Sequence, residues 1–311
     1  MSRQPAHPII FATLIVIGGL AIFLGYLNAG LALLVGLVIA LVLRHSFTGY
    51  CRKYSAMALK TAIVGMGFGL NIQQVIATTQ QTFLVTFLTI AIAIIAGILL
   101  VKLLRVHKET GILVTSGTAI CGGSAIAAVS QVIKSRSDHT AMAVTVVFLL
   151  NIVALYAFPI LGEFFELTQH QFGIWAALAI HDTSSVLGAA AQFGQEALEI
   201  ATTTKLFRAL WIIPLTLLVG YWNKQPGAKP HIPIFIVLFV VASLVNSYLP
   251  LGVIADYTAH FSKKLMIFAL FLLGLGITPD IVKNLDPKPL LLGTLLWITI
   301  AAVSLVLVLY H

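Results

Sequence analysis

Long apolar runs follow one another along nearly the whole chain, and they constrain the fold more than any other feature of the sequence. They cover residues 8–25, 29–43, 57–77, 83–104, 111–130, 140–162, 172–192, 202–222, 232–249, 259–279 and 288–310. A membrane-spanning helix needs about 20 apolar residues, and these runs do not alternate as the strands of a membrane barrel do. The sequence therefore predicts an all-α polytopic membrane protein with about eleven transmembrane helices.

Composition excludes the soluble classes of protein. Of the 311 residues, 59% are hydrophobic and 9% are charged, whereas soluble domains carry roughly 25% charged residues. A soluble globule of this size could not cover so much apolar surface with polar groups. Soluble enzymes, nucleic-acid-binding proteins and disordered proteins are therefore excluded. We expect residues 1–311 to form one membrane domain whose solvent is the lipid bilayer.

The net charge of +8 suggests an orientation in the membrane. Lys and Arg concentrate in cytoplasmic loops, and this bias favours a cytoplasmic N-terminus. The clusters expected in the cytoplasm are Arg44, Arg52 and Lys53; Lys102, Arg105 and Lys108; Lys224 and Lys229; and Lys283 and Lys288. The clusters expected outside or at the outer interface are Lys134 and Arg136; Lys205 and Arg208; and Lys263 and Lys264.

A glycine-rich interruption at 117–128 marks the first candidate site. Each glycine weakens a helix by roughly 1 kcal/mol relative to Ala, and in a membrane the freed backbone groups need partners in protein or in a wet cavity. A broken helix presents N–H groups that can bind an anion. The alternative is a close-packed helix crossing without a ligand. The candidate substrate-binding residues here are Thr118, Cys121, Gly122, Gly123 and Ser124.

Five consecutive polar residues, His181 to Ser185, form the second candidate site. On a continuous helix, Ser184 and Ser185 would share a face with His181. A carboxylate at this depth must be paired or hydrated, and a histidine titrates near neutral pH. We therefore expect His181 and Asp182 to couple transport to a proton or ion, and Thr183, Ser184 and Ser185 to bind substrate. The alternative is a hydrogen-bonded cap that joins two half-helices.

Lys205 and Arg208 form a third candidate, because residues three apart share a helix face. Two cations beside the hydroxyls of residues 202–204 suit an oxyanion, although snorkelling at the membrane interface explains them equally well. Asn151 lies in the middle of a run and could hydrogen-bond between helices.

Internal similarities suggest an inverted repeat. Residues 67–72 match 274–279, and the spacing of Ser124 and Gln131 matches that of Ser185 and Gln192. On our count of spans the first pair is antiparallel, as an inverted repeat requires, whereas the second pair is parallel. Either one span is re-entrant or miscounted, or the second similarity is only compositional.

With these motifs the sequence resembles the YeiH-like family of sulfate exporters of the bacterial inner membrane. The resemblance covers essentially the whole chain and rests on residues 117–128, residues 181–185, Lys205 with Arg208, and the helix ends at 67–71 and 274–278. The family is similar to the cation-antiporter and bile-acid-symporter group. That relation implies inverted repeats, two discontinuous crossing helices and substrate at the crossing. Asn71 stands where such families are expected to carry a basic residue, and we keep it with Asn151 as a supporting residue.

Three functions compete at this stage. The first is a secondary transporter that exports a small anion, sulfate or a sulfonate, coupled to protons or sodium because the chain shows no nucleotide-binding motif. The second is a cation/proton antiporter that uses Asp182. The third is an enzyme built on Cys121 or Ser124 with His181 and Asp182, but adjacent helical residues point about 100° apart, so we expect no enzyme. We expect no cofactor, metal or nucleic acid, and a homodimer is left open.

Overall fold

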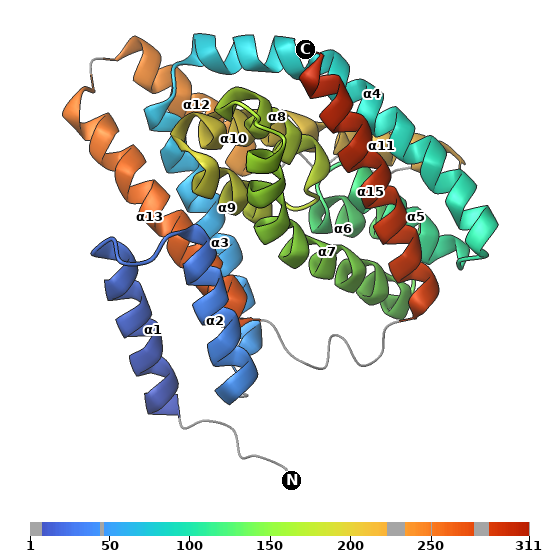
Figure 1. The fold of residues 1–311 in the computed structure, drawn as a ribbon, viewed down its shortest axis with the longest axis horizontal. Coiled ribbons are helices and arrows are strands. Elements are labelled where there is room, and N and C mark those ends of the chain that lie inside the picture. Colours follow the sequence, from blue (N-terminus) through green and yellow to red (C-terminus); the bar gives the residue numbers. More distant parts are fainter. Residues whose placement is uncertain (1–7, 44–46, 223–233, 250, 277–285, 311) are drawn as a thin grey trace. The chain divides into compact units, whose positions relative to one another are not determined.

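The chain is all-helical over the part that the structure describes. A computed structural model describes residues 8–43, 47–222, 234–249, 251–276 and 286–310 (Figure 1). Each predicted apolar run contains a helix or a pair of short helices, which confirms the polytopic all-α class. The elements are α1 Pro8–Phe23, α2 Ala29–Leu43, α3 Thr48–Met66, η1 Gly67–Gly69, α4 Ile72–Leu104, α5 Lys108–Ala119, α6 Gly123–Val132, α7 Ser137–Phe164, α8 Gln169–Ala179, α9 Thr183–Phe193, α10 Gln195–Leu210, α11 Ile212–Trp222, α12 Ile234–Tyr248, α13 Val253–Leu275 and α15 Pro287–Leu309.

Within the described ranges, five helical stretches are long and apolar enough to cross a membrane by length and composition alone. They are Ile72–Leu104, Ser137–Phe164, Gln195–Trp222, Val253–Leu275 and Pro287–Leu309. The predicted loop residues Arg44, Lys224, Lys229 and Lys283 lie outside the described residues, as does Thr278 of the predicted helix end at 274–278. The cytoplasmic N-terminus therefore stays a prediction, as does the inverted repeat.

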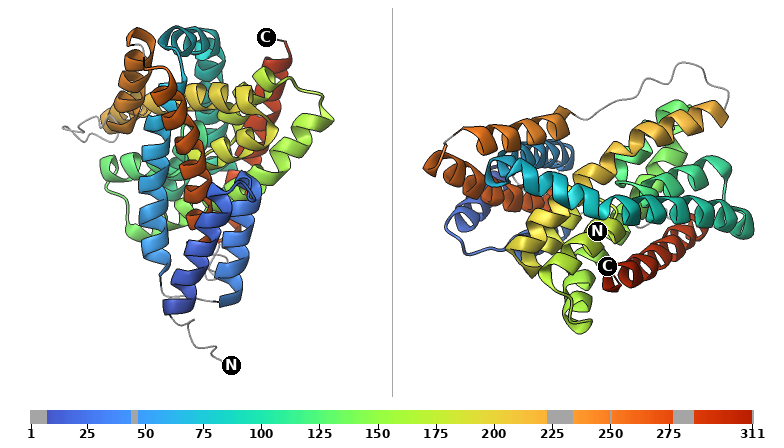
Figure 2. Two further views of the ribbon diagram at one scale, coloured as in Figure 1. Left: turned by 90° about the vertical axis from the view of Figure 1, so that its left-hand side faces the viewer. Right: turned by 90° about the horizontal axis from the view of Figure 1, so that it is seen from above.

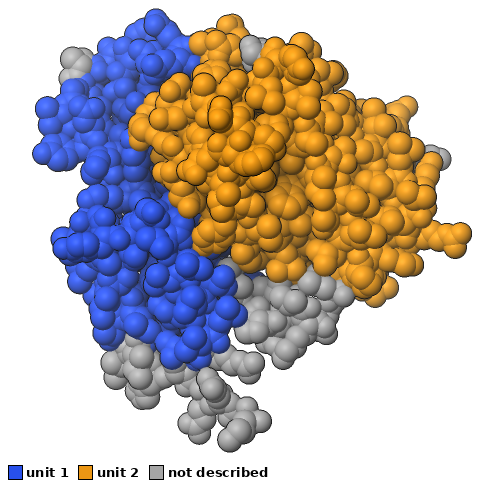
Figure 3. All heavy atoms as spheres, in the orientation of Figure 1, with its two compact units in different colours: residues 1–75, 233–284 blue, residues 76–232, 285–311 orange. Residues whose placement is uncertain are grey.

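The chain folds into two compact units, each built from segments that are distant in the sequence (Figure 3). Unit 1 comprises residues 1–75 and 233–284, and unit 2 comprises residues 76–232 and 285–311. The helix α4 belongs to unit 2 from Ile76 onward. The expectation of one membrane domain stays a prediction for the chain as a whole.

In unit 1, α13 packs against α2 and α3 (Figures 1 and 2). Glycines allow the close approach: a Cβ on Gly36 would meet the carbonyl oxygen of Phe271, and one on Gly274 would meet that of Leu33. Small residues bring membrane helices together in this way, because lipid itself provides no hydrophobic drive for helix association. The predicted helix end at 67–71 is confirmed, since η1 separates α3 from α4.

In unit 2, the broken pairs α5–α6 and α8–α9 pack with α7 and α10. The helix α15 lies against α5, α7 and α8, and the Trp175 indole N–H donates to the Ala301 carbonyl at 2.9 Å. Trp175 also stacks on Phe158, with ring centroids 4.3 Å apart. These contacts fix the long helices of unit 2 around the two breaks.

Substituting Gly36 with Ala tests the close helix crossing of unit 1. The added methyl would overlap the Phe271 carbonyl, and overpacking of this kind costs typically about 1–3 kcal/mol. We expect a clear fall in the thermal unfolding temperature of the detergent-purified protein. Gly49→Ala is the matched control, because a Cβ at Gly49 meets nothing within 4 Å. Equal unfolding temperatures for the two variants would contradict the crossing.

Candidate functional site at the crossing of two discontinuous helices

The first break separates α5 from α6 at Ile120, Cys121 and Gly122. Gly122 has φ +60° and ψ −123°, a conformation that residues with a side chain rarely adopt. Its N–H donates to the Gly117 carbonyl at 2.9 Å, which closes the end of α5. The predicted break at Gly122 and Gly123 is therefore confirmed, and its cause is the conformational freedom of Gly122.

The second break separates α8 from α9, and Asp182 is the N-cap of α9. Its carboxylate accepts a hydrogen bond from the Ser184 N–H at 3.1 Å and another from the Ser184 hydroxyl. Its own N–H donates to the Asn151 side chain at 3.2 Å. The cap that joins two half-helices is thus present. The expectation that His181 shares a helix face with Ser184 and Ser185 is wrong, because His181 precedes the first residue of α9.

The two breaks lie against each other within unit 2. A Cβ on Gly122 would sit 3.4 Å from the backbone nitrogen of Asp182 and 3.4 Å from the carbonyl carbon of His181. These distances are those of van der Waals contact, so the backbones of the two breaks pack directly on each other, and the positive φ of Gly122 favours glycine at this point. The two discontinuous helices therefore cross at their breaks. Asn151 on α7 accepts a hydrogen bond from the Asp182 N–H and so positions the second break.

Lys205 closes the carboxyl ends of both half-helices. Its ammonium group donates to the carbonyls of Ile120 at 3.2 Å, Ala177 at 3.2 Å and Ile180 at 2.7 Å. A lysine has three N–H donors, so all of them are used. The last carbonyls of a helix have no partner within the helix. Lys205 supplies a donor to Ala177 in α8, to Ile180 just beyond α8 and to Ile120 just beyond α5.

Arg208 completes the cap of α5. Its Nε donates to the carbonyls of Ala119 and Ile120, both at 3.1 Å, and a terminal nitrogen donates to Ala119 at 2.7 Å. The other terminal nitrogen donates to the Thr89 hydroxyl on α4 at 3.0 Å. Lys205 and Arg208 are 1% and 0% exposed. This burial contradicts the snorkelling alternative, whereas the position of both residues outside or at the outer interface stays a prediction.

The charges at the crossing do not cancel. Each break brings the partly negative end of one half-helix beside the partly positive end of the next, so the helix dipoles offset each other. What remains among the described residues of the crossing is two cations, Lys205 and Arg208, against the carboxylate of Asp182. The only ion pair among the described residues is Arg136 with Asp138, elsewhere in unit 2. The crossing therefore has a net positive charge.

Exposure divides the candidate residues into an open group and a buried group. Ser124 is exposed, Gly123, Asp182 and Thr183 are half-buried, and a Cβ on Gly123 would meet nothing within 4 Å. The open group is thus the first turn of α6 and of α9, where backbone N–H groups lack helical acceptors. The buried group comprises Thr118, Cys121, His181, Ser184, Ser185, Lys205 and Arg208.

In this group and beside it in α10, several buried polar atoms have no hydrogen-bond partner among the described residues. They include both ring nitrogens of His181, which is 2% exposed, and the hydroxyls of Thr118 and Thr204. Buried polar groups are rarely left without partners, so these atoms are candidates for contact with a bound ligand or water. Both cysteines, Cys51 and Cys121, are free and buried. No cluster of three potential metal-ligating side chains occurs in the described ranges.

Sequence reasoning missed the contribution of α4 and placed one residue with the wrong group. Thr82, Thr86 and Thr89 are fully buried at spacings of four and three, and Thr89 is the partner of Arg208. Three hydroxyls on one helical face within an apolar run are a pattern from which the buried polar contact could have been predicted. Asn71 belongs to unit 1, where its side chain accepts from the Gln73 N–H at 2.8 Å at the start of α4.

The fold and site define a polytopic helical membrane protein with two discontinuous helices that cross in its interior. The chain belongs to the family described as conserved hypothetical protein 698, which matches residues 9–293. It is similar to UPF0324 membrane proteins of several bacteria. That of Porphyromonas gingivalis is 38% identical over 98% of this chain and 96% of its own, and that of Bacteroides thetaiotaomicron is 38% identical over 93% and 88%. That of Photobacterium profundum is 47% identical over 79% of this chain and 76% of its own. No solved structure matches the chain.

Replacing Lys205 with Ala tests its role as a cap. The change leaves buried carbonyls of Ile120, Ala177 and Ile180 without this donor, and each unsatisfied buried group costs about 1–3 kcal/mol. We expect thermal unfolding in detergent to fall well below that of the wild type. Lys288→Ala removes an equal charge from an exposed position and should stay within about 0.5 kcal/mol of wild type. If Lys205→Ala unfolds together with this control, the capping role is contradicted.

Proposed function

We propose that this protein is a secondary active transporter that exports a small sulfur oxyanion, sulfate or a sulfonate, across the bacterial inner membrane. The observation that carries the proposal is the net positive charge of a helix crossing whose open groups are two half-helix amino ends. The relatives are named membrane proteins, and the resemblance to the YeiH-like exporters and to the cation-antiporter and bile-acid-symporter group supplies the sulfur substrate and the transporter class.

The anion is held, in this proposal, between the first turns of α6 and α9. The backbone N–H groups at Gly123 and Ser124 and the hydroxyls of Ser124 and Thr183 are donors at the open end of the crossing. Helix amino ends bind anions because their N–H groups and dipoles both favour negative charge. Thr118, Cys121, Gly122, Ser184 and Ser185 form the buried wall behind these donors.

Lys205 and Arg208 contribute through charge and position. Because the three N–H donors of Lys205 already bind carbonyls, the lysine stabilises a substrate by its charge without touching it. Arg208 is always protonated in proteins and acts in the same way from behind Ala119 and Ile120. Two fixed cations in a medium of low dielectric attract an anion far more strongly than they would in water.

Asp182 carries the coupling proton or sodium ion in this proposal. It is half-buried at the open end of the crossing, and its negative charge opposes an anion beside Thr183. A proton or sodium on Asp182 removes that opposition, so the coupling ion and the anion favour each other's binding. His181 adjoins Asp182 and is buried, and neither ring nitrogen has a partner among the described residues. In this proposal these ring nitrogens take part with Asp182 in binding the coupling proton or ion.

This coupling is compatible with export of a doubly charged anion. A sulfate that travels with one proton still carries one net negative charge across the membrane. An inside-negative potential then favours its exit by about 2.3 kcal/mol per 100 mV. No nucleotide is needed, since the membrane potential and the substrate gradient supply the free energy.

The rival function is a cation/proton antiporter, and the partial exposure of Asp182 favours it. One accessible carboxylate can exchange a proton for a sodium or lithium ion. The rival must place that cation beside two fixed cations with a single carboxylate to compensate, and for this reason we prefer the anion carrier.

Binding of sulfate should depend on the hydroxyl of Ser124. A ligand at one hundred times its Kd stabilises the folded state by about 2.7 kcal/mol, so sulfate should raise the unfolding temperature of the purified protein. Loss of one hydrogen bond to a charged ligand costs about 1.5–3 kcal/mol, so Ser124→Ala should bind sulfate roughly tenfold or more weakly. The control Ser130→Ala removes a hydroxyl of the same helix that donates to the Ala127 carbonyl. Stabilisation by sodium or lithium alone would remove the anion proposal.

Asp182→Asn separates the two functions. The neutral side chain mimics the protonated carboxyl, so sulfate binding should persist or strengthen and should lose its dependence on pH. Proteoliposomes loaded with sulfate should still exchange it for external radiolabelled sulfate, while proton-coupled net transport should cease. The antiporter predicts loss of sodium-dependent stabilisation and no effect of sulfate in either protein.

A further inference from the structure

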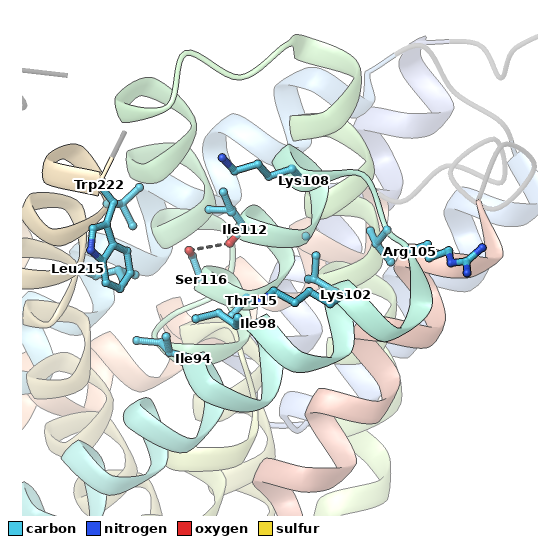
Figure 4. A pocket seen from close by; sticks show the side chains of 14 residues that line it. Ile94, Ile98, Lys102, Arg105, Lys108, Ile112, Thr115, Ser116, Leu215 and Trp222 are labelled. Carbon is cyan, nitrogen blue, oxygen red and sulfur yellow. Dashed lines mark hydrogen bonds between the residues drawn. The ribbon is translucent and has the colours of Figure 1, made fainter. Parts of the chain in front are cut away.

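A cavity lies within unit 2, and none of the residues of the two helix breaks lines it. Its volume is about 620 Å³, and its walls come from α4, the first turns of α5, and α11 (Figure 4). This volume is within the range of about 300–1,000 Å³ that is typical of small-molecule sites. The lining is mainly aliphatic, and it includes three cations, Lys102, Arg105 and Lys108.

The lining changes from apolar to cationic along a single face of α4. Ile94, Ile98 and Lys102 are four residues apart and share one face of α4, and Arg105 follows just beyond the end of the helix, with a positive φ. From Ile94 to Lys102 the helix rises about 12 Å. The wall that α4 contributes is thus apolar at Ile94 and Ile98 and charged at Lys102, in the last turn of the helix.

The opposite wall is formed by α11 and has the same polarity. Leu215 and Val219 are buried, whereas Trp222 at the end of α11 is 67% exposed. In Figure 4 the Lys108 side chain extends over the cavity toward the side where Trp222 lies. Tryptophan is enriched at the level of lipid headgroups, so we expect the cationic residues of the cavity at the membrane interface.

The three cations are not neutralised by protein carboxylates. None of them forms an ion pair among the described residues. The carboxylate of Glu109, next to Lys108, is turned to the loop between α6 and α7. There it accepts hydrogen bonds from the Ser135 hydroxyl at 3.0 Å and the Arg136 N–H at 3.1 Å. The cationic residues of the cavity therefore lack a negative partner.

We propose that this cavity binds an anionic phospholipid. An acyl chain lies along Ile94, Ile98 and Leu215, and the phosphate headgroup lies among Lys102, Arg105 and Lys108. A free oxyanion would gain nothing from the aliphatic walls, and a lipid without net charge would leave the three cations uncompensated. Basic pockets between membrane helices bind anionic headgroups on the same principle.

The lipid also contacts the first of the two discontinuous helices. Thr115 and Ser116 on α5 line the cavity, one turn before Ala119, whose carbonyl Arg208 holds. A bound lipid therefore supports the half-helix that leads to the first break. This assignment rests on the geometry of the cavity alone and is independent of the transport proposal.

Retention of phosphatidylglycerol in native mass spectrometry tests the proposal. The wild type should keep one phosphatidylglycerol in preference to phosphatidylcholine. The combined variant Lys102→Gln, Arg105→Gln and Lys108→Gln should bind it about a hundredfold more weakly, since each cation near the headgroup contributes roughly a factor of five. The control variant Lys53→Gln, Lys134→Gln and Lys288→Gln removes the same charge from exposed positions. Lys134 has a positive φ, as Arg105 has, so both triple variants place one glutamine in this backbone conformation.

Two further arms identify the ligand as a lipid. Ile98→Trp fills the partly exposed apolar wall and keeps all three cations, so it should also reduce retention. Inorganic phosphate should neither displace phosphatidylglycerol nor stabilise the protein. The proposal is overturned if the two triple variants lose lipid equally, if phosphatidylcholine is retained as well as phosphatidylglycerol, if Ile98→Trp has no effect, or if inorganic phosphate competes.

Discussion

The burial of Lys205 and Arg208 against helix carbonyl ends is the interaction on which the crossing depends. A helix that breaks inside a membrane frees carbonyl groups that water cannot reach, and each must find a donor in the protein. Both cations come from neighbouring turns of α10 and together satisfy carbonyls of the first break and of the end of α8. The helix α10 thereby holds the ends of α5 and α8 next to each other.

This arrangement gives the crossing two chemically different sides. The carboxyl ends of the half-helices are covered by the cations and closed to solvent. The amino ends of α6 and α9 remain open at Gly123, Ser124 and Thr183, with Asp182 as the carboxylate between them. A site of this form favours an anion by its overall charge and can be adjusted by a single proton or cation at Asp182. The cavity that we propose for a lipid runs along α5 from Lys108 to Ser116, so the same half-helix contributes to both proposed sites.

The sequence predicted the positions of the breaks but not the partners that stabilise them. Gly122 and Asp182 could be identified because backbone conformation and capping are local properties of the chain. The place of Lys205 could not, because a cation in an apolar run suits the membrane interface and a buried carbonyl cluster equally well. Asn71 and Asn151 looked equivalent for the same reason, yet one caps α4 and the other holds Asp182. The division into two units depends on contacts between distant segments, which local patterns do not encode.

The central claim is that the open amino ends of α6 and α9 bind an oxyanion, and anomalous scattering tests it most directly. Selenate has the shape and charge of sulfate, and its selenium can be located in crystals of the protein soaked with it. The account predicts an anomalous peak within hydrogen-bond distance of the backbone N–H groups of Gly123 or Ser124 and near the Thr183 hydroxyl. A peak only at other places, or none at the crossing under saturating selenate, would contradict the account.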